Sequence, residues 1–471
     1  MADFGYDVAD YCDVEPLFGD LAAFDSLLAA AHARGLKLIL DFVPNHSSDR
    51  HPWFVESRSS RDNPKRDWYI WRDARPDGAP PNNWTSDFGG SSWEWDAATG
   101  QYYLHAFLKE QPDLNWRNPD LREAMMDVLH FWLDRGVDGF RIDVLWHIVK
   151  AQGLPDNPPN PAYGPHLGER DKVLQINSTD QPETHDISAD FRALADAYGA
   201  RVLIGEIVLP NDRLCAYYGT PERPEIHLPC NFALLDNAWD ARGLSRVIAD
   251  YEAALPLGGW PNWAIGSHDA PRIAARLGEA QARVAAMLLL TLRGTPTLYQ
   301  GDELGIGPVT IPPSRLRDPR ELREPGLGLG RDRSRTPMPW DGSPQAGFSE
   351  VEPWLPLGDD WARRNVAVQQ ADAGSMLAHY RRLLALRRQY AALAIGDYLG
   401  VAEQDDVLAF ERRHDGERLF IALNLGRHDC PVALPPGTSI ARTLHSTLFP
   451  RPFDGTLRGD EGLILLLGKA Q

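Results

Sequence analysis

The chain has 471 residues, 43% of them apolar and 24% charged, a composition that is typical of a folded globular protein. Its formal net charge of -18 repels phosphate backbones, and no apolar run approaches the roughly 18 residues that a membrane-spanning helix needs. We therefore expect neither nucleic acid nor membrane among its partners, and the charge suits a neutral small-molecule substrate.

The four cysteines, Cys12, Cys215, Cys230 and Cys430, are sparse and show no metal-ligand spacing. Such thiols are typical of a reducing compartment. No signal peptide is visible at the start of the sequence. These features predict a cytoplasmic protein.

The first predicted helix begins at Leu21, where Asp20 can act as its cap and apolar residues recur at helical spacing. Gly35 ends this helix. The segment 36–42 follows and is almost continuously apolar, which predicts a strand buried on both faces, as in parallel sheets. This strand ends in a carboxylate, Asp41.

The same helix-then-strand unit returns further along the chain. Predicted helices at 121–133, 189–198 and 281–292 are followed by strands at 137–143, 201–206 and 294–300. This alternation predicts helices packed around a parallel sheet. Acidic residues at the carboxyl ends of successive strands indicate a TIM barrel, whose active site lies on that face.

Two stretches interrupt the alternation, and the last part of the chain changes character. Residues 43–118 are rich in Trp, Asp, Pro and Gly, and predict a long insertion after the strand that ends at Asp41. Residues 303–362 are rich in loop signals, and a last helix follows at 376–388. Strands are then predicted at 407–412, 418–424, 430–434 and 462–467, with a hairpin turn at Asp415-Gly416. We therefore predict four segments: a first barrel part at 1–42, an insertion domain at 43–118, a second barrel part with the catalytic residues at 119–394, and an antiparallel β-sandwich at 395–471.

Three acids stand at or just after predicted strand ends: Asp143, Glu206 and Asp269. Hydrolysis of a glycosidic bond needs two carboxyl groups, one ionised as a nucleophile and one protonated as an acid. Arg141 precedes Asp143 by two residues, so its side chain points to the same side and is expected to keep Asp143 ionised. The many Trp residues of 43–118 suit a sugar site, although aromatic core accounts for most such residues.

Six ordered segments resemble the signature blocks of a known family, the α-amylase family of glycoside hydrolases. Two of them, at 111–116 and 331–340, resemble segments of its oligo-1,6-glucosidase and α-glucosidase branch. The segments are DFVPNH (41–46), QPDLNW (111–116), GFRIDV (139–144), GE (205–206), SHD (267–269) and RDRSRTPMPW (331–340). Ser267 departs from the pattern, because asparagine is usual before the His-Asp pair.

The resemblance implies a role for each of the acids. Asp143 looks like the nucleophile that forms a β-glucosyl-enzyme, and Glu206 looks like the acid/base. Asp269 looks like the third acid, which grips sugar hydroxyls as the ring distorts. Asp41 resembles the structural acid near Arg141.

The resemblance also implies the residues that bind the sugar. His46 and His268 look like hydrogen-bond donors to the glucose in the cleavage subsite. Asp3 resembles the acid that takes the terminal 4-hydroxyl, Tyr6 the tyrosine that stacks on the ring, and Arg335 the arginine that closes the pocket beside Asp3.

In this family the barrel opens with a strand, a helix and a second strand before the Gly-Tyr-Asp segment, which here begins at Gly5. We therefore expect an N-terminally truncated barrel that lacks about 55–60 residues, an exposed edge on the strand ending at Asp41, and Asp3 and Tyr6 held loosely at a free terminus. Relatives bind a calcium-like ion in a loop of that first unit, so we expect no metal and no cofactor here.

The sequence leaves several functions open. The first is an exo-acting α-glucosidase that cuts terminal glucose from small α-glucosides. Because Val144 follows the predicted nucleophile, the resemblance implies a preference for α-1,6 or α-1,1 links. The second is a glucosyl-transferring relative of the isomaltulose or trehalose synthase type. The others are a non-enzymatic relative, like the heavy subunits of amino-acid transporters, and an inactive fragment.

Overall fold

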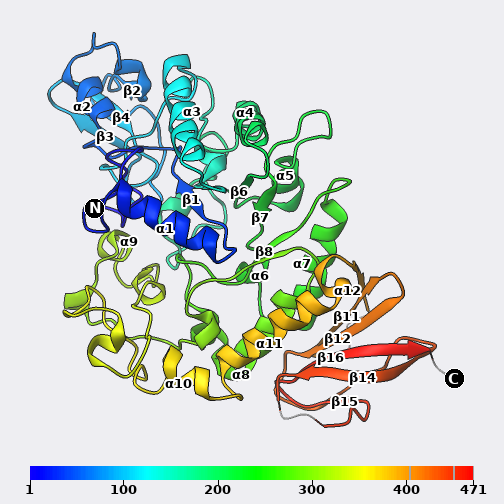
Figure 1. Cartoon of the computed structure of the whole chain (residues 1–471). Helices are drawn as coiled ribbons and strands as arrows, with labels where there is room; N and C mark the ends of the chain where they lie inside the picture. Colours follow the sequence, from blue (N-terminus) through cyan, green and yellow to red (C-terminus); the bar gives the residue numbers. More distant parts are fainter. Residues whose placement is uncertain (402–404, 449–450, 470–471) are drawn as a thin grey trace. The chain divides into compact units, whose positions relative to one another are not determined.

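The computed structural model describes residues 1–401, 405–448 and 451–469 (Figure 1). The chain forms two compact units. The first comprises Met1–Pro229 with Asp318–Gly330, and the second comprises Cys230–Arg317 with Arg331–Gln471. No helix within the described ranges is long and apolar enough to cross a membrane.

The main sheet of the first unit has four strands in the order β1 (Ile39–Phe42), β5 (Gly139–Ile142), β6 (Val202–Glu206) and β7 (Leu228–Cys230). The pairs β1–β5 and β5–β6 are parallel, with Asp41 opposite Arg141 and Ile142 opposite Gly205. Because parallel strands end at the same edge, this register brings the predicted strand-end acids together.

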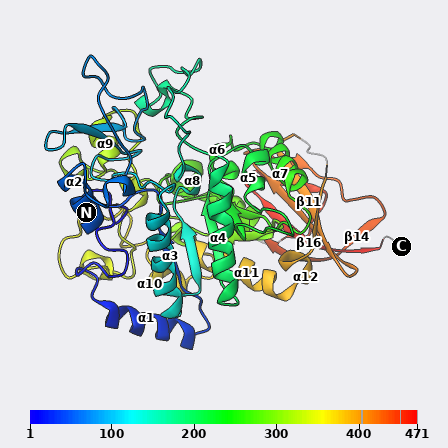
Figure 2. The same cartoon turned by 90° about the horizontal axis from the view of Figure 1, so that it is seen from above.

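Two helices of the first unit, α3 (Pro119–Asp134) and α4 (Glu183–Ala197), lie side by side (Figure 2). The side chain of Asn118 caps α3 by accepting the backbone N–H groups of Asp120 and Leu121, and Pro119 occupies the first helical position. The residues of α3 that are buried recur at i, i+4, i+7 and i+8, and they are Leu121, Met125, Val128, Leu129, Trp132 and Leu133. This helix confirms the expectation from periodicity.

The strand predicted at 36–42 is shorter and more exposed than expected. Only Ile39–Phe42 forms the strand, Asp41 is exposed, and Leu36 is 59% exposed. The expectation of burial on both faces was wrong because β1 lies at the edge of its sheet, where β5 is its one strand partner among the described residues. Helix α1 (Leu21–Ala33) begins where Asp20 predicts, but Leu28 is its one fully buried residue.

The segment between β1 and α3 forms a small lobe with its own sheet. Helix α2 (Pro52–Ser59) precedes three antiparallel strands in the order β2 (Trp71–Arg72), β4 (Gln101–Leu104) and β3 (Trp93–Asp96). Most tryptophans here are buried: Trp71, Trp84, Trp93 and Trp116. They therefore serve as aromatic core, and not as a sugar platform.

The second unit contains a parallel strand pair, β8 (Asn262–Ala264) with β9 (Thr295–Thr297). Helix α8 (Ile273–Thr291) starts eight residues before the predicted helix at 281, because a turn at Gly278, with φ of 78°, joins two helical stretches into one. Helix α7 (Ala241–Ala254) was not predicted, although it is amphipathic. The remaining helices of the chain are α5 (Asn211–Ala216), α6 (Ala233–Asp236), α9 (Pro319–Arg323), α10 (Val366–Ala371), α11 (Met376–Gln389) and α12 (Ala391–Ala394).

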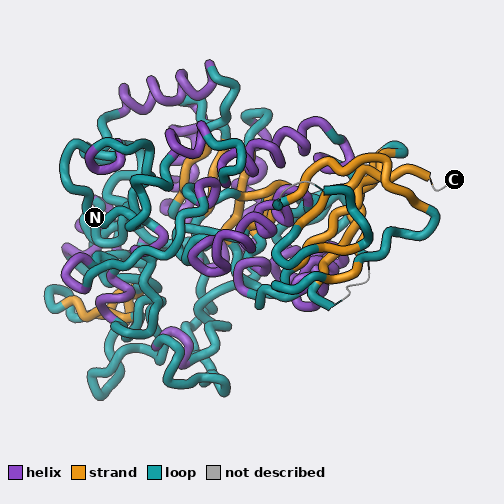
Figure 3. The backbone as a smooth tube through the Cα atoms, turned by 90° about the horizontal axis from the view of Figure 1, so that it is seen from below, coloured by secondary structure: helices purple, strands orange, loops and turns teal. Residues whose placement is uncertain are grey.

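The chain ends in an antiparallel sheet (Figure 3). Its strand order is β10 (Asp397–Gly400), β11 (Val407–His414), β12 (Glu417–Asn424), β16 (Gly462–Lys469) and β14 (Thr438–Ser446), and the strands β13 (Cys430–Pro431) and β15 (Thr456–Leu457) form a separate pair. Asp415 and Gly416 form the predicted two-residue hairpin, with φ of 44° and 84°. β14 was missed because most of its residues are polar and only Leu444 and Ser446 are buried.

Candidate active site

Arg141 is the centre of a cluster of carboxylates at the ends of β1, β5 and β6. Its Nη1 lies 2.7 Å from Asp41 and 2.7 Å from Asp143, and its Nη2 lies 2.8 Å from Glu206. The side chains of Asp143 and Glu206 are only 9% and 12% exposed. One guanidinium group therefore holds both predicted catalytic acids, since its planar fork offers several donors in fixed directions.

The backbone around the two acids also fixes them. Asp143 follows β5, and its N–H donates to the carbonyl of Phe42 in the neighbouring strand. Val144 adopts a left-handed conformation, with φ of 35°, and its N–H donates to Glu206 Oε2 at 2.9 Å. A β-branched residue rarely adopts this conformation, and such strain is concentrated at functional sites.

Arg141 acts on Asp143 in the expected direction, but burial outweighs it. Burial raises the pKa of Asp143 well above its ordinary value; Arg141 lowers it, and the carboxylates of Glu206 and Asp41 raise it again. The arginine is in place, but its single positive charge is shared by three acids. The pKa of Asp143 is therefore raised although the arginine is in contact with it.

Asp3 and Tyr6 are anchored, contrary to the expectation of a loose terminus. Asp3 is 3% exposed and accepts a hydrogen bond from Gln111 Nε2 at 3.2 Å. The Tyr6 hydroxyl donates to Asp41 at 2.8 Å and lies 3.3 Å from Arg141 Nη1. The N-terminal loop is thus joined to the carboxylate cluster through Tyr6 and to the segment 111–116 through Asp3.

His46 is 1% exposed and both of its ring nitrogens have polar neighbours. Nδ1 lies 3.1 Å from the amide nitrogen of Asn45, and Nε2 lies 2.9 Å from the carbonyl oxygen of Tyr6. Burial lowers its pKa below the ordinary value, so the ring is neutral at pH 7. Neither Asn45 nor Gln111 was singled out from the sequence, although both lie inside the quoted segments.

The second unit carries the third acid with its own cluster of cations. Arg335 lies 2.8 Å from Asp269, Arg331 lies 3.5 Å from it, and His268 lies 3.3 Å from it. Burial raises the pKa of Asp269, but these three groups outweigh burial and lower it below the ordinary value. The hydroxyl of Ser267, at the position that departs from the family pattern, accepts the Asp269 N–H. Arg331 was not predicted, although it opens the segment 331–340.

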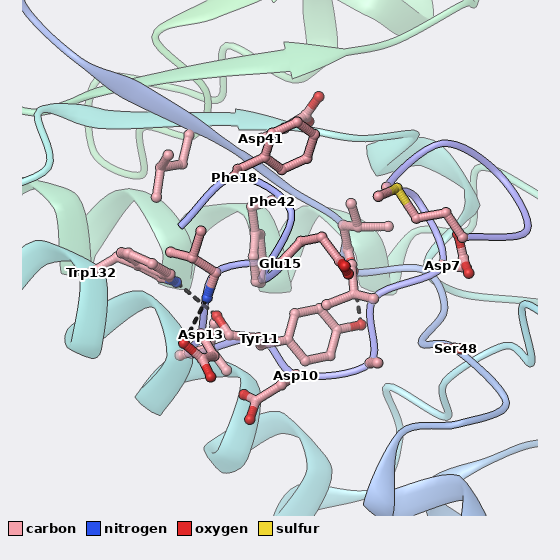
Figure 4. Close-up of a pocket in the computed structure, with 18 of the residues that line it drawn as sticks. Asp7, Asp10, Tyr11, Asp13, Glu15, Phe18, Asp41, Phe42, Ser48 and Trp132 are labelled. Carbon is pink, nitrogen blue, oxygen red and sulfur yellow. Dashed lines mark hydrogen bonds between the residues drawn. The ribbon is translucent and has the colours of Figure 1, made fainter. Parts of the chain in front are cut away.

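A cavity of about 540 Å³ opens beside β1 in the first unit (Figure 4). Aromatic residues and acids line it together, among them Tyr11, Phe18, Phe42 and Trp132. Of the predicted site residues only Asp41 lines this cavity. It is therefore a feature of the β1 edge, and it does not mark the carboxylate cluster itself.

Comparisons with known proteins agree with this arrangement. Residues 1–396 match the family described as alpha amylase, catalytic domain, and residues 399–468 match a domain of unknown function, DUF3459. The chain belongs to the α-amylase family. It is a glycoside hydrolase whose catalytic domain has the TIM barrel fold of that family, followed by an antiparallel sheet domain.

The names of individual relatives describe different functions. A probable α-glucosidase from Rhizobium meliloti is 41% identical over 449 residues, which cover 92% of this chain and 81% of the relative. An oligo-1,6-glucosidase from Halalkalibacterium halodurans is 36% identical, and the match covers 91% of this chain and 82% of the relative. An amino acid transporter heavy chain from Homo sapiens is 38% identical, and the match covers 90% of this chain and 63% of the relative. The crystal structure of an alpha-glucosyl transfer enzyme has a TM-score of 0.92 and 39% identity, and covers 99% of this chain and 89% of that one.

Proposed function

We propose that this hydrolase is a retaining, exo-acting α-glucosidase that removes terminal α-linked glucose from disaccharides and short oligosaccharides. The observation that carries the proposal is the shared contact of Asp143 and Glu206 with one arginine. Retaining glycosidases need their two carboxyl groups only about 5–5.5 Å apart, whereas inverting enzymes need about 6.5–9.5 Å to admit a water molecule. Two acids on one guanidinium favour the shorter separation.

In this mechanism Asp143 attacks the anomeric carbon while Glu206 donates its proton to the leaving oxygen. The glycosidic bond breaks and a β-glucosyl ester forms on Asp143. Glu206, now ionised, then takes a proton from water, and the resulting hydroxide attacks the ester and releases α-glucose.

The other predicted residues act on the sugar. We assign Asp269 to the hydroxyls that bind more tightly as the ring flattens, and the low pKa of this residue keeps it ionised for that task. Asp3 and Arg335 recognise the terminal glucose, Tyr6 stacks on its ring, and His46 and His268 contribute hydrogen bonds. These roles rest on the family resemblance of the segments that contain them.

Product stereochemistry tests the mechanism directly. Proton NMR of the first turnover of isomaltose or trehalose should show α-glucose before mutarotation, and glucose should be the sole early product. With trehalose, in which both anomeric carbons are locked in the α configuration, early β-glucose would exclude retention. Release of longer products from malto-oligosaccharides before glucose would exclude exo-action.

A second candidate is glucosyl transfer, the activity for which a solved structure with 39% identity is named. Transfer competes with hydrolysis for the same glucosyl-enzyme, so the two reactions share Asp143 and Glu206. Product analysis at high sucrose or maltose concentration separates them. New disaccharides in excess of free glucose would assign transfer as the main activity.

A further inference from the structure

Lys150 is a buried lysine that the mechanism does not use. It lies in the segment after β5, and it is 2% exposed. Its ammonium group is 2.7 Å from Asp113, 2.7 Å from Asn45 Oδ1, and in contact with the carbonyl of His147. Asp113 and Asn45 are themselves fully buried. A buried charge that is fully paired in this way holds its neighbours in one arrangement.

The chemistry of Lys150 determines the orientation of the Asn45 amide. An ammonium group has three donors and no acceptor, so the Asn45 atom that faces it must be the oxygen. The amide nitrogen then faces the other side, where it donates to the Asp113 carboxylate at 3.1 Å. Two neighbours of opposite character thus fix the same orientation.

The Asn45 amide in turn determines which nitrogen of His46 carries the proton. The Asn45 nitrogen lies 3.1 Å from His46 Nδ1 and can only donate, so Nδ1 must accept. A neutral ring then carries its proton on Nε2, which faces the Tyr6 carbonyl, an acceptor, at 2.9 Å. Gln111 Nε2 also lies 3.0 Å from His46 Nε2, but its two hydrogens have acceptors in Asp3 Oδ2 at 3.2 Å and the Tyr6 carbonyl at 3.3 Å, so it does not require Nε2 to accept. Gln111 Oε1 accepts the Leu108 N–H, which fixes the orientation of this amide.

We propose that Lys150 is a positioning residue that acts through Asn45 to hold His46 as the Nε2–H tautomer, and that this tautomer anchors the Tyr6 loop. The anchored Tyr6 carries the hydroxyl that lies on Asp41 and near Arg141. Without the lysine only Asp113 fixes the Asn45 amide, so the flipped orientation gains population, His46 populates both tautomers, and the bond from His46 to the Tyr6 carbonyl is lost in part of the molecules. The catalytic consequence rests on the proposed function, because it requires Tyr6 to contact the sugar.

Nitrogen-15 NMR of the full chain labelled on the histidine rings tests the tautomer without any activity. The His46 signals are those missing from a His46→Gln variant. We expect an unprotonated shift at Nδ1 and a protonated shift at Nε2. Asn45→Asp places an acceptor opposite Nδ1, so Nδ1 should become protonated. A wild-type Nδ1 that carries the proton, or an Asn45→Asp spectrum identical to that of the wild type, overturns the proposal.

Kinetics of Lys150→Met tests the link from the tautomer to the sugar site. We expect kcat/KM to fall by about 10- to 100-fold, mainly through KM, because Tyr6 contacts the sugar before and during bond cleavage. Lys150→Gln is neutral but still a donor, so its kcat/KM should lie between those of the unmodified chain and of Lys150→Met. It replaces Lys150→Met if that variant does not fold. An unchanged KM together with an unchanged tautomer in a folded Lys150 variant contradicts the role of the lysine.

His147→Phe is the matched control. His147 lies three residues before Lys150, its ring nitrogens have no hydrogen-bond partner in the described part of the chain, and Lys150 touches only its backbone carbonyl. Its substitution alters the same buried segment, so it is expected to change the melting temperature while leaving the tautomer and KM as they are. If the wild-type chain hydrolyses no α-glucoside, the proposed function fails, and the NMR result still decides the tautomer.

Discussion

Arg141 carries one positive charge and contacts three carboxylates, Asp41, Asp143 and Glu206. At the scale of single residues, this excess of carboxylates over positive charge contributes to the pKa of Asp143. Burial raises the pKa of Asp143, and an arginine shared among three acids leaves an excess of negative charge that raises it further. The protonation of Asp143 is therefore a property of the whole cluster.

Replacement of Arg141 should move the acidic limb of the pH–rate profile. In Arg141→Gln nothing opposes the burial of Asp143 or the charges of its neighbours, so its pKa rises further and kcat/KM should decline from a higher pH as the solution is acidified. Arg141→Lys keeps the charge without the planar fork, so the acidic limb of its profile should lie between those of the unmodified chain and of Arg141→Gln. Profiles of kcat/KM from pH 4 to 9 measure this. An acidic limb that is unchanged in Arg141→Gln would show that the arginine does not control the pKa of Asp143.

Asp143→Asn should remove turnover and leave the fold intact. An amide cannot form the glucosyl ester, so we expect kcat to fall by about 10⁴-fold or more. The circular dichroism spectrum and the melting temperature should stay near those of the unmodified chain. Glu123→Gln, an exposed acid on α3, is the control and should retain full activity. Residual turnover above a hundredth of the original rate would exclude Asp143 as the nucleophile.

Val144 provides a test of linkage preference. In the family, valine after the nucleophile goes with α-1,6 links and threonine with α-1,4 links. Val144→Thr keeps the volume of this buried side chain, so we expect the ratio of kcat/KM for isomaltose to that for maltose to fall by about tenfold. A ratio that does not change would show that other residues set the linkage.

At the scale of elements, two histidines join α11 to the C-terminal strand β14. His379 Nε2 faces the carbonyl of Arg283, so it donates, and His379 Nδ1 therefore accepts from His445 Nε2 at 2.9 Å. Burial lowers the pKa of His379 to about 3 and that of His445 to about 4. Both rings are thus neutral in the folded chain near pH 7.

This pair should make stability fall in mild acid. The unfolded histidines titrate near pH 6.5, so between about pH 6.5 and pH 4 the unfolded state binds more protons than the folded state. Stability is complete above that window and decreases as the pH falls through it, by roughly 3 kcal/mol per histidine at pH 4. Urea unfolding at pH 7, 6 and 5 measures the slope.

His445→Gln should flatten that slope, because glutamine donates to His379 but does not titrate. Leu444→Ala, at the neighbouring buried position of β14, is the control. It should lower stability by about 2–4 kcal/mol at every pH without changing the slope. Equal slopes in the unmodified chain and in His445→Gln would contradict the assignment.

At the scale of the whole molecule, one group of exposed apolar side chains lies around α1. Leu17, Phe18, Leu27 and Leu36 are 75%, 72%, 56% and 59% exposed. They lie within twenty residues of one another, next to β1, which is an edge strand of the main sheet. An exposed edge beside apolar side chains is a known site of association between chains.

We therefore expect these 471 residues, expressed as such, to associate with increasing concentration. The double variant Leu17→Lys/Leu27→Lys should reduce the association, as measured by sedimentation velocity, without loss of activity. Leu257→Lys is the matched control, because Leu257 is 99% exposed in the second unit, far along the chain from α1. An unmodified chain that stays monodisperse at high concentration would refute the expectation.

Local signals in the sequence were sufficient for much of the fold. Asp20 starts its helix as predicted, Asp415-Gly416 forms the predicted hairpin, and acids stand at the ends of β5 and β6. Caps, turns and periodicity depend on neighbours within a few residues, so they can be recognised without the rest of the chain. The predicted domain limits and the roles of the sugar-binding residues stay predictions.

Tertiary structure alone decided what depends on distant neighbours. The existence of β14 follows from pairing with β16, since its own polar pattern gives no strand signal. The raised pKa of Asp143 follows from burial and from two carboxylates supplied by other strands. Burial, register and shared charge are set by residues up to a hundred positions apart, and a sequence read in short windows does not contain them.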